Sequence, residues 1–132
     1  MKTSCLLASS SKVVTFVPTK NAEQARLFYE DTLGLTFQSD DAFALVFEQN
    51  GTMLRVVRVG NFTPAPFTVL GWDVENIVAA AADLRDRGVA FQKFPGLDQD
   101  EAGIWTAPNA ARVAWFLDPD GNVLSISQGP SL

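Results

Sequence analysis

The spacing of apolar and polar positions in the first half of the chain predicts one helix among four strands. The helix is expected over residues 22–33, because Ala25, Phe28 and Leu33 recur at helical spacing. Asn21, directly before it, is a suitable N-cap. Stretches rich in β-branched and aromatic residues predict the strands, at residues 13–17, 35–38, 42–49 and 52–59. The predicted order of elements is therefore β, α, β, β, β.

The same order begins again in the second half, after a linker with two prolines at residues 61–66. A second helix is expected over residues 75–87, where Ile77 and Leu84 share one face. Extended stretches are expected at residues 67–74, 89–94, 103–106, 112–117 and 123–127, with a strong turn at Asp118–Gly121 before the last. Placing Gly34, which ends the first helix, on Gly88, which ends the second, superposes the two halves.

This repetition predicts an α+β fold made of two βαβββ modules in tandem, at residues 12–60 and 66–128. An apolar fraction of 47% supports a packed core. Each module alone is too small to bury its sheet well. We therefore expect the two modules to pack together as a single domain over residues 1–132.

The charge of the chain disfavours two classes of partner. The formal net charge is −5, and only ten lysine and arginine residues are scattered along the sequence. Nucleic acids and anionic membrane surfaces need clustered basic residues, so we expect neither as a partner. In residues 67–132, nine acidic residues outnumber four basic ones, so the net charge lies in this half. Such a field attracts cationic ligands, although an acidic surface also simply favours solubility.

The cysteine content and hydropathy favour a cytoplasmic protein. The single cysteine, Cys5, excludes an internal disulfide. No apolar run approaches the roughly 20 residues of a membrane span. The apolar stretch that begins at Cys5 is too short for the core of a signal peptide, and it precedes a predicted strand.

Three stretches resemble the vicinal oxygen chelate superfamily, which includes glyoxalases, bleomycin-resistance proteins and extradiol dioxygenases. They are NAEQARLFYEDTLGL at residues 21–35, VENIVAAAADLRDRGV at residues 74–89 and VAWFLDPDGNVLSIS at residues 113–127. They are similar to the two helices and the closing hairpin of that superfamily, in the right order. The resemblance implies a glyoxalase-like fold, in which tandem modules form a curved mixed sheet around a cavity.

The resemblance also identifies the positions at which enzymes of the superfamily bind a divalent metal. Two of these positions fall on Val14 and Val69, and a third, where relatives have Glu, falls on Ser125. The fourth lies within residues 53–55. The chain contains no histidine, and valine and serine are not suitable ligands for such a metal. We therefore expect no metal and no cofactor, and we do not carry over glyoxalase or dioxygenase activity.

Aromatic side chains on the predicted strands are the main candidates for a ligand site, because their flat faces stack on planar molecules and attract cations. Ordinary core packing is the alternative explanation for them. Arg55 lies mid-strand among apolar neighbours, so it either faces outward or has a partner. An acidic loop at residues 95–105 resembles a segment that borders the cavity in glyoxalase-like folds; a solvated loop is the alternative. The expected ligand-binding residues are Val14, Phe16, Phe47, Glu48, Arg55, Val69, Trp105, Trp115 and Ser125, and no catalytic residue is assigned.

The leading hypothesis is a non-catalytic, metal-free protein that binds a small molecule, planar or cationic, similar to bleomycin-resistance proteins. One alternative is a metal-independent lyase or isomerase that uses Glu48 or Arg55. Another is a divergent, inactive relative whose cavity has filled with side chains. Small two-module proteins of the superfamily often dimerise, so the resemblance also implies a homodimer.

Overall fold

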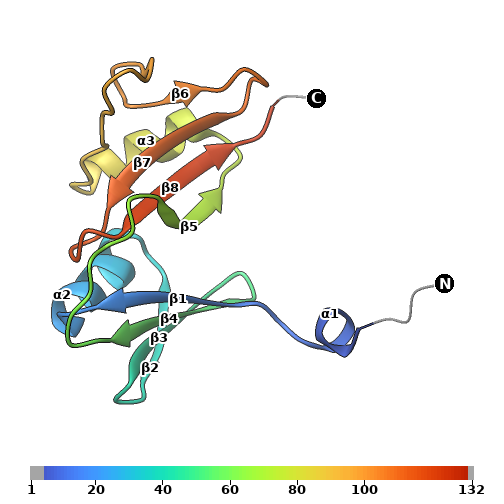
Figure 1. Ribbon diagram of the computed structural model, residues 1–132, viewed down its shortest axis with the longest axis vertical. Coiled ribbons are helices and arrows are strands. Elements are labelled where there is room, and N and C mark those ends of the chain that lie inside the picture. The colour runs from blue at the N-terminus through green and yellow to red at the C-terminus, as the bar shows by residue number, and fades with distance from the viewer. Residues whose placement is uncertain (1–4, 131–132) are drawn as a thin grey trace.

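The protein forms two four-stranded sheets, each accompanied by helical segments (Figure 1). The computed structural model describes residues 5–130. The first half contains α1 (Leu6–Ser10), β1 (Val14–Thr19), α2 (Ala22–Arg26), the π-helix η1 (Leu27–Thr32), β2 (Thr36–Asp40), β3 (Ala44–Gln49) and β4 (Thr52–Arg58). The second half contains β5 (Thr68–Asp73), α3 (Ile77–Asp86), β6 (Trp105–Thr106), β7 (Arg112–Leu117) and β8 (Val123–Gln128). The expected α+β fold of two similar repeats is confirmed.

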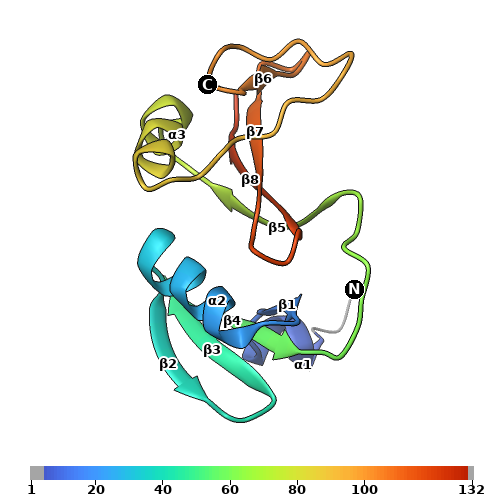
Figure 2. The same cartoon turned by 90° about the vertical axis from the view of Figure 1, so that its left-hand side faces the viewer.

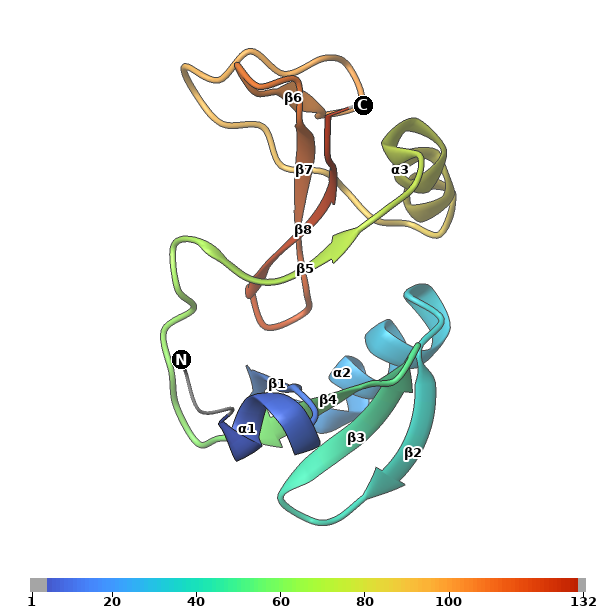
Figure 3. The ribbon, with the colours of Figure 1, turned by 90° about the vertical axis from the view of Figure 1, so that its right-hand side faces the viewer.

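Both sheets have the same topology. Their strand orders are β1-β4-β3-β2 and β5-β8-β7-β6, with the first strand of each repeat parallel to the last and the other pairs antiparallel. α2 and η1 lie on the side of the first sheet that faces the second half, and α3 flanks the second sheet (Figures 2 and 3). Each sheet therefore has one face covered by helices and one face without them.

The first helix begins at its predicted cap, Asn21, and the second begins after Asn76, which was not predicted as a cap. The Asn21 side chain accepts a hydrogen bond from the amide of Gln24 at 3.2 Å, and Asn76 begins α3 in the same way. The first helix does not remain α-helical, because beyond Arg26 its turns widen, with the Leu33 amide bonding the carbonyl of Phe28 at 2.9 Å. A widened turn keeps a similar apolar face, so the spacing of apolar residues does not distinguish it from an α-helix.

The two repeats share one apolar core, as their small size requires. Phe116 in β7 is 1% exposed and lies at its centre. Its ring is 6.5 Å from that of Phe28 in the first half, 6.4 Å from Trp72 and 5.7 Å from Phe91. These contacts join side chains of the second half of the chain to η1 in the first half.

A buried polar network fastens the turn at Asp118–Gly121 to the first half of the chain. The Tyr29 hydroxyl donates to Asp118 Oδ2 at 2.6 Å, and the side-chain amide of Asn122 donates to the same oxygen at 2.8 Å. Asp118 Oδ1 accepts the amides of Asp120 and Asn122, both at 2.9 Å. Thr19 at the end of β1 donates to Asp120 at 2.6 Å. We call these five residues the turn network; among residues 5–130, the 5% exposed carboxylate of Asp118 has no ion-pair partner.

The turn network makes the stability of the folded protein depend on pH in the alkaline range. Burial, followed by the charge of Asp118 and its hydrogen bond, raises the pKa of the Tyr29 phenol far above its usual value. In the unfolded chain a tyrosine ionises near pH 10. The stabilisation is thus complete below about pH 10 and decreases as the pH rises further, because only the unfolded state then loses the proton.

Tyr29 is the only tyrosine in the sequence, so the ultraviolet absorbance of tyrosinate reports on this residue alone. We expect no tyrosinate until the protein unfolds in alkali, with the absorbance and circular dichroism transitions coinciding. A tyrosinate signal that rises near pH 10 while the circular dichroism stays native would show that the phenol is not held as described.

The strand predicted over residues 89–94 is wrong. Only Phe91 forms a bridge, opposite Phe116, and the Gln92 amide bonds the carbonyl of Trp115. The Gln99 side chain takes the place of a strand partner, because it accepts from the Phe94 amide at 2.8 Å and donates to the Gln92 carbonyl at 2.9 Å. The strand expected over residues 103–106 is likewise reduced to the two residues of β6.

The short helix α1 was not predicted. Serine hydroxyls support it locally, because Ser9 and Ser10 donate to the carbonyls four residues before them, at 3.1 and 2.8 Å. All five of its residues are exposed. Within residues 5–130, neither α1 nor any other helix is long and apolar enough to cross a membrane.

Candidate functional site

The faces of the two sheets that helices do not cover, which we call the open faces, carry most of the expected ligand-binding residues. On the first sheet, strand register places Phe16 opposite Arg55, and both Val14 and Glu48 opposite Met53. Phe16 is 59% exposed and Val14 38% exposed. Four of the expected residues thus share the first open face.

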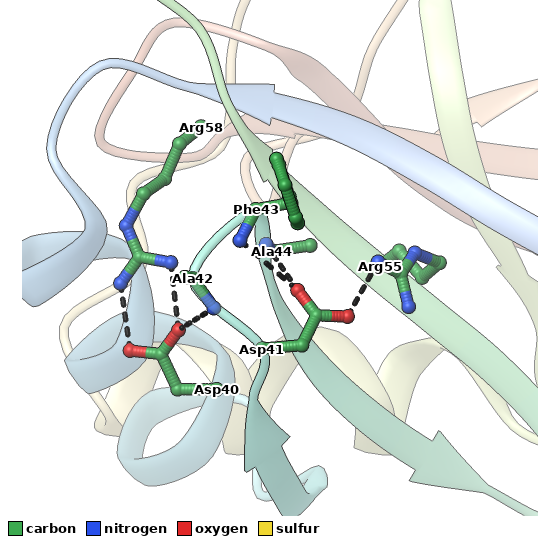
Figure 4. A network of polar contacts seen from close by, with 7 residues as sticks. All are labelled: Asp40, Asp41, Ala42, Phe43, Ala44, Arg55 and Arg58. Atoms are coloured by element: carbon green, nitrogen blue, oxygen red, sulfur yellow. Dashed lines mark hydrogen bonds and ion pairs between the residues drawn. The ribbon is translucent and has the colours of Figure 1, made fainter.

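Arg55 on this face has an ionic partner, which was one of the two alternatives for a charge in mid-strand. Its guanidinium bonds Asp41 at 2.7 Å, and Arg58 holds both carboxylate oxygens of the neighbouring Asp40 at 2.7 Å (Figure 4). The turn between β2 and β3 is tight, and Ala42 adopts a φ of 73° there. The two arginines therefore fix this turn against β4 by bonds made within the chain.

The ion pair of Asp40 with Arg58 makes the stability of the folded protein depend on pH in the acidic range. Hydrogen bonds from Arg58 and then from the Ala42 amide lower the pKa of Asp40 to about 2. Its stabilising effect is present above the unfolded pKa, near pH 4, and is lost as the pH falls through about 2. We expect Asp40→Asn to unfold at lower urea concentration than the unaltered protein at pH 7, with the difference shrinking toward pH 2. A difference independent of pH would contradict the ionic role.

The second open face carries a cluster of three aromatic rings. The rings of Trp105 and Trp115 are 6.2 Å apart, and Phe94 meets Trp115 edge-on at 5.4 Å. Phe94 is 41% exposed, and both tryptophans are half-buried. We call Phe94, Trp105 and Trp115 the aromatic cluster. It offers apolar surfaces on which a flat molecule can stack.

Ser125 lies beside this cluster, between two strands. It is opposite Trp115 on β7 and opposite Gly71 on β5. A Cβ atom at Gly71 would lie 2.8 Å from the Ser125 hydroxyl oxygen, so glycine is needed for this close approach. Val69, at an irregularity in β5, is 37% exposed. Trp105, Trp115, Ser125 and Val69 are therefore brought together on one sheet.

Phe47 does not join either group. It lies on the helix-covered face of β3, is 0% exposed, and packs 5.9 Å from Tyr29 and 5.6 Å from Phe37. The three residues before it in β3 are also buried, so this part of the strand has no alternation in burial from which the orientation of Phe47 could be read.

The acidic loop is shaped by its own side chains. Asp100 accepts the amides of Ala102 and Ile104 at 2.9 Å, which closes a turn. Gln99 additionally donates to the Gly103 carbonyl at 2.8 Å. The loop thereby supports Phe94, the member of the aromatic cluster that sequence reasoning missed. Nothing in its sequence beyond an aromatic residue beside Pro95 could have indicated it.

The residues that the resemblance assigns to metal-ligand positions do not fit a divalent metal. Val14 and Val69 offer no donor atom, and Ser125 offers only a hydroxyl. Glu48 uses one carboxylate oxygen to accept the Gly51 amide at 2.6 Å, which supports the β3–β4 hairpin. Within residues 5–130, no group of three His, Cys, Asp or Glu side chains could hold an ion. The arrangement is suited to binding by stacking and shape.

The fold and the open faces define a class of small α+β proteins in which two βαβββ repeats present uncovered sheet surfaces. The chain belongs to the Glyoxalase/Bleomycin resistance protein/Dioxygenase superfamily, whose family model matches residues 12–126. This match confirms the resemblance found in the sequence. A comparison with curated proteins finds no match.

Solved structures show the same fold. TnmS3, an antibiotic binding protein from Streptomyces sp. CB03234, is 28% identical with a TM-score of 0.65, over 90% of this chain and 96% of its own. The bleomycin resistance determinant encoded on the transposon Tn5 is 17% identical with a TM-score of 0.70, over 91% and 98%. A glyoxalase/bleomycin resistance protein/dioxygenase from Nocardioides is 18% identical with a TM-score of 0.68, over 96% and 91%. The last two likenesses concern the fold alone.

Proposed function

We propose that this protein binds a planar small molecule without transforming it, and that the aromatic cluster beside Ser125 is the main contact. The single observation that carries the proposal is the presence of three partly exposed rings beside Ser125 on the second open face. The 28% identity to an antibiotic binding protein supports the same kind of function. A cationic ligand is favoured by the net charge of −5 and by the affinity of ring faces for cations.

We further propose that the working form is a homodimer. The expected site residues fall into two groups, one on each sheet. Large apolar side chains also remain exposed in or beside β1 and β5, the first strands of the two repeats. Among them are Val13 at 74%, Phe16 at 59%, and Phe67 at 64%. If the second open face of one copy lay over the first open face of the other copy, these side chains would be covered. The two groups of site residues would then form one cavity. The module limits of 12–60 and 66–128 and the cytoplasmic location stay predictions.

The dimer is tested by sedimentation velocity. We expect two chains per particle, and we expect Phe16→Asp to give a folded monomer, because the added charge would be buried against the partner. Asp31→Asn, a substitution at an exposed position on η1, is the matched control and should stay dimeric. A monomeric unaltered protein at micromolar concentration would reject this part of the proposal.

The binding function is tested by thermal denaturation against planar antibiotics, bleomycin included, in the presence of a chelator. A ligand at 100 times its Kd stabilises the folded state by about 2.7 kcal/mol, which is a shift of several degrees. Recovery of the unchanged ligand supports binding alone. Turnover despite the chelator would instead support the metal-independent enzyme, and no response to any compound would favour the inactive relative.

A further inference from the structure

A pocket of about 280 Å³ lies between the two halves of the chain. Its walls come from β1, β3 and β4 of the first sheet and from β5 of the second. The apolar part includes Leu35, Phe47, Leu54, Leu70 and Trp72. We call it the seam pocket. It is separate from the aromatic cluster, because none of the three cluster residues lines it.

The seam pocket has a polar floor that bridges the two sheets. The Trp72 indole donates to the side-chain oxygen of Gln49 at 2.7 Å. This bond leaves the amide hydrogens of Gln49 as donors at the pocket wall. A smaller apolar extension of about 170 Å³ shares Leu35, Gln49 and Trp72 with it and continues toward α3. A ligand in the seam pocket would therefore meet one face of an indole and an adjoining apolar space.

The charged residues that line the seam pocket are all acidic. They are Glu48 and Asp73, while Asp83 lines the extension. Asp83 is paired with Arg87 at 3.3 Å, and Glu48 has one oxygen bonded to the Gly51 amide. Asp73 has neither an ion pair nor a side-chain hydrogen bond within residues 5–130. An anionic ligand would be repelled here, and a cationic group would be attracted.

We propose that the seam pocket is a second ligand site, which binds a small aromatic amine with its ring against Trp72 and its ammonium group toward Asp73. A volume of about 280 Å³ suits a compact molecule with one ring and a short chain. The proposal is independent of the function assigned to the aromatic cluster, since Phe94, Trp105 and Trp115 do not line the seam pocket.

The test uses 4-phenylbutylamine and, as a charge control, 4-phenylbutyrate. In the double variant Trp105→Phe/Trp115→Phe, Trp72 is the only tryptophan, so its fluorescence reports on the seam pocket while the aromatic cluster is altered. We expect a saturable change with a Kd of about 1 mM for the amine, as ligand efficiency suggests for a molecule of this size, and binding of the carboxylate at least about 5-fold weaker. Equal binding of both compounds would overturn the proposal.

Two further variants localise the site. Thr52 is exposed, lines the seam pocket and pairs with Gln49 in the β-hairpin, so Thr52→Phe should fill the pocket and weaken amine binding at least about 5-fold. Thr36→Phe, a substitution at an exposed position of β2 that does not line the seam pocket, is the matched control and should bind as before. The indole N–H signal of Trp72 in nuclear magnetic resonance spectra of the unaltered protein gives a readout free of substitutions. If the Thr52→Phe variant binds the amine as tightly as the unaltered protein does, or if the Trp72 signal does not shift when the amine is added, the site is rejected.

Discussion

Replacing Asp118 by alanine is expected to lower the free energy of unfolding by about 3–5 kcal/mol, because several buried donors lose their acceptor at once. The Tyr29 hydroxyl, the Asn122 side chain and two backbone amides all converge on this carboxylate, which is 5% exposed. The lost hydrogen bonds connect the two halves of the chain, since Tyr29 belongs to η1 and Asp118 follows β7. Urea denaturation followed by circular dichroism measures it.

The matched control is Asp98→Ala, which alters an exposed acid in the loop and should change stability by less than about 0.5 kcal/mol. A double-mutant cycle with Tyr29→Phe and Asp118→Asn separates the shared bond from other effects, and we expect a coupling of about 1–3 kcal/mol. Independent effects of the two substitutions, or a loss below about 1 kcal/mol for Asp118→Ala, would show that the turn network does not hold the halves together.

Trp115→Ala is expected to reduce affinity for the planar ligand about 30-fold, corresponding to a loss of about 2 kcal/mol. Trp115 is the central ring of the aromatic cluster, since it contacts both Trp105 and Phe94 and lies opposite Ser125. Removing it takes away its own stacking surface and the support of both neighbours. Isothermal titration calorimetry with a ligand from the antibiotic panel measures the change.

Trp115→Phe keeps a ring in this place and should lose less affinity than the alanine variant. Trp72→Phe changes a tryptophan on the helix side of the second sheet and should leave affinity for the planar ligand within about 2-fold. A larger loss for Trp72→Phe than for Trp115→Ala would move the site from the open face to the seam pocket.

Three of the expected site residues, Val14, Val69 and Ser125, came from the resemblance to the superfamily, and the structure places most of the expected residues on the open faces. Val14 and Phe16 sit two residues apart and share a face, as do Val69 and Gly71 in β5. Phe47 was placed with the site and lies in the core, because residues 44–47 of β3 are all buried and give no alternation to follow. Phe94 was not found, because its position depends on bonds from Gln99, a residue that the pattern of a strand does not reveal.

The sequence by itself determined the order of elements, the cap at Asn21, the turn at Asp118–Gly121 and the lack of histidine. These features depend on residues a few positions apart, or on composition alone, so the pattern is enough to derive them. Only the tertiary structure decided that Asp118 is buried beneath Tyr29, that three rings meet beside Ser125, and that a pocket opens next to Trp72. Each of these depends on segments distant in sequence, whose relative position is set by packing of the shared core.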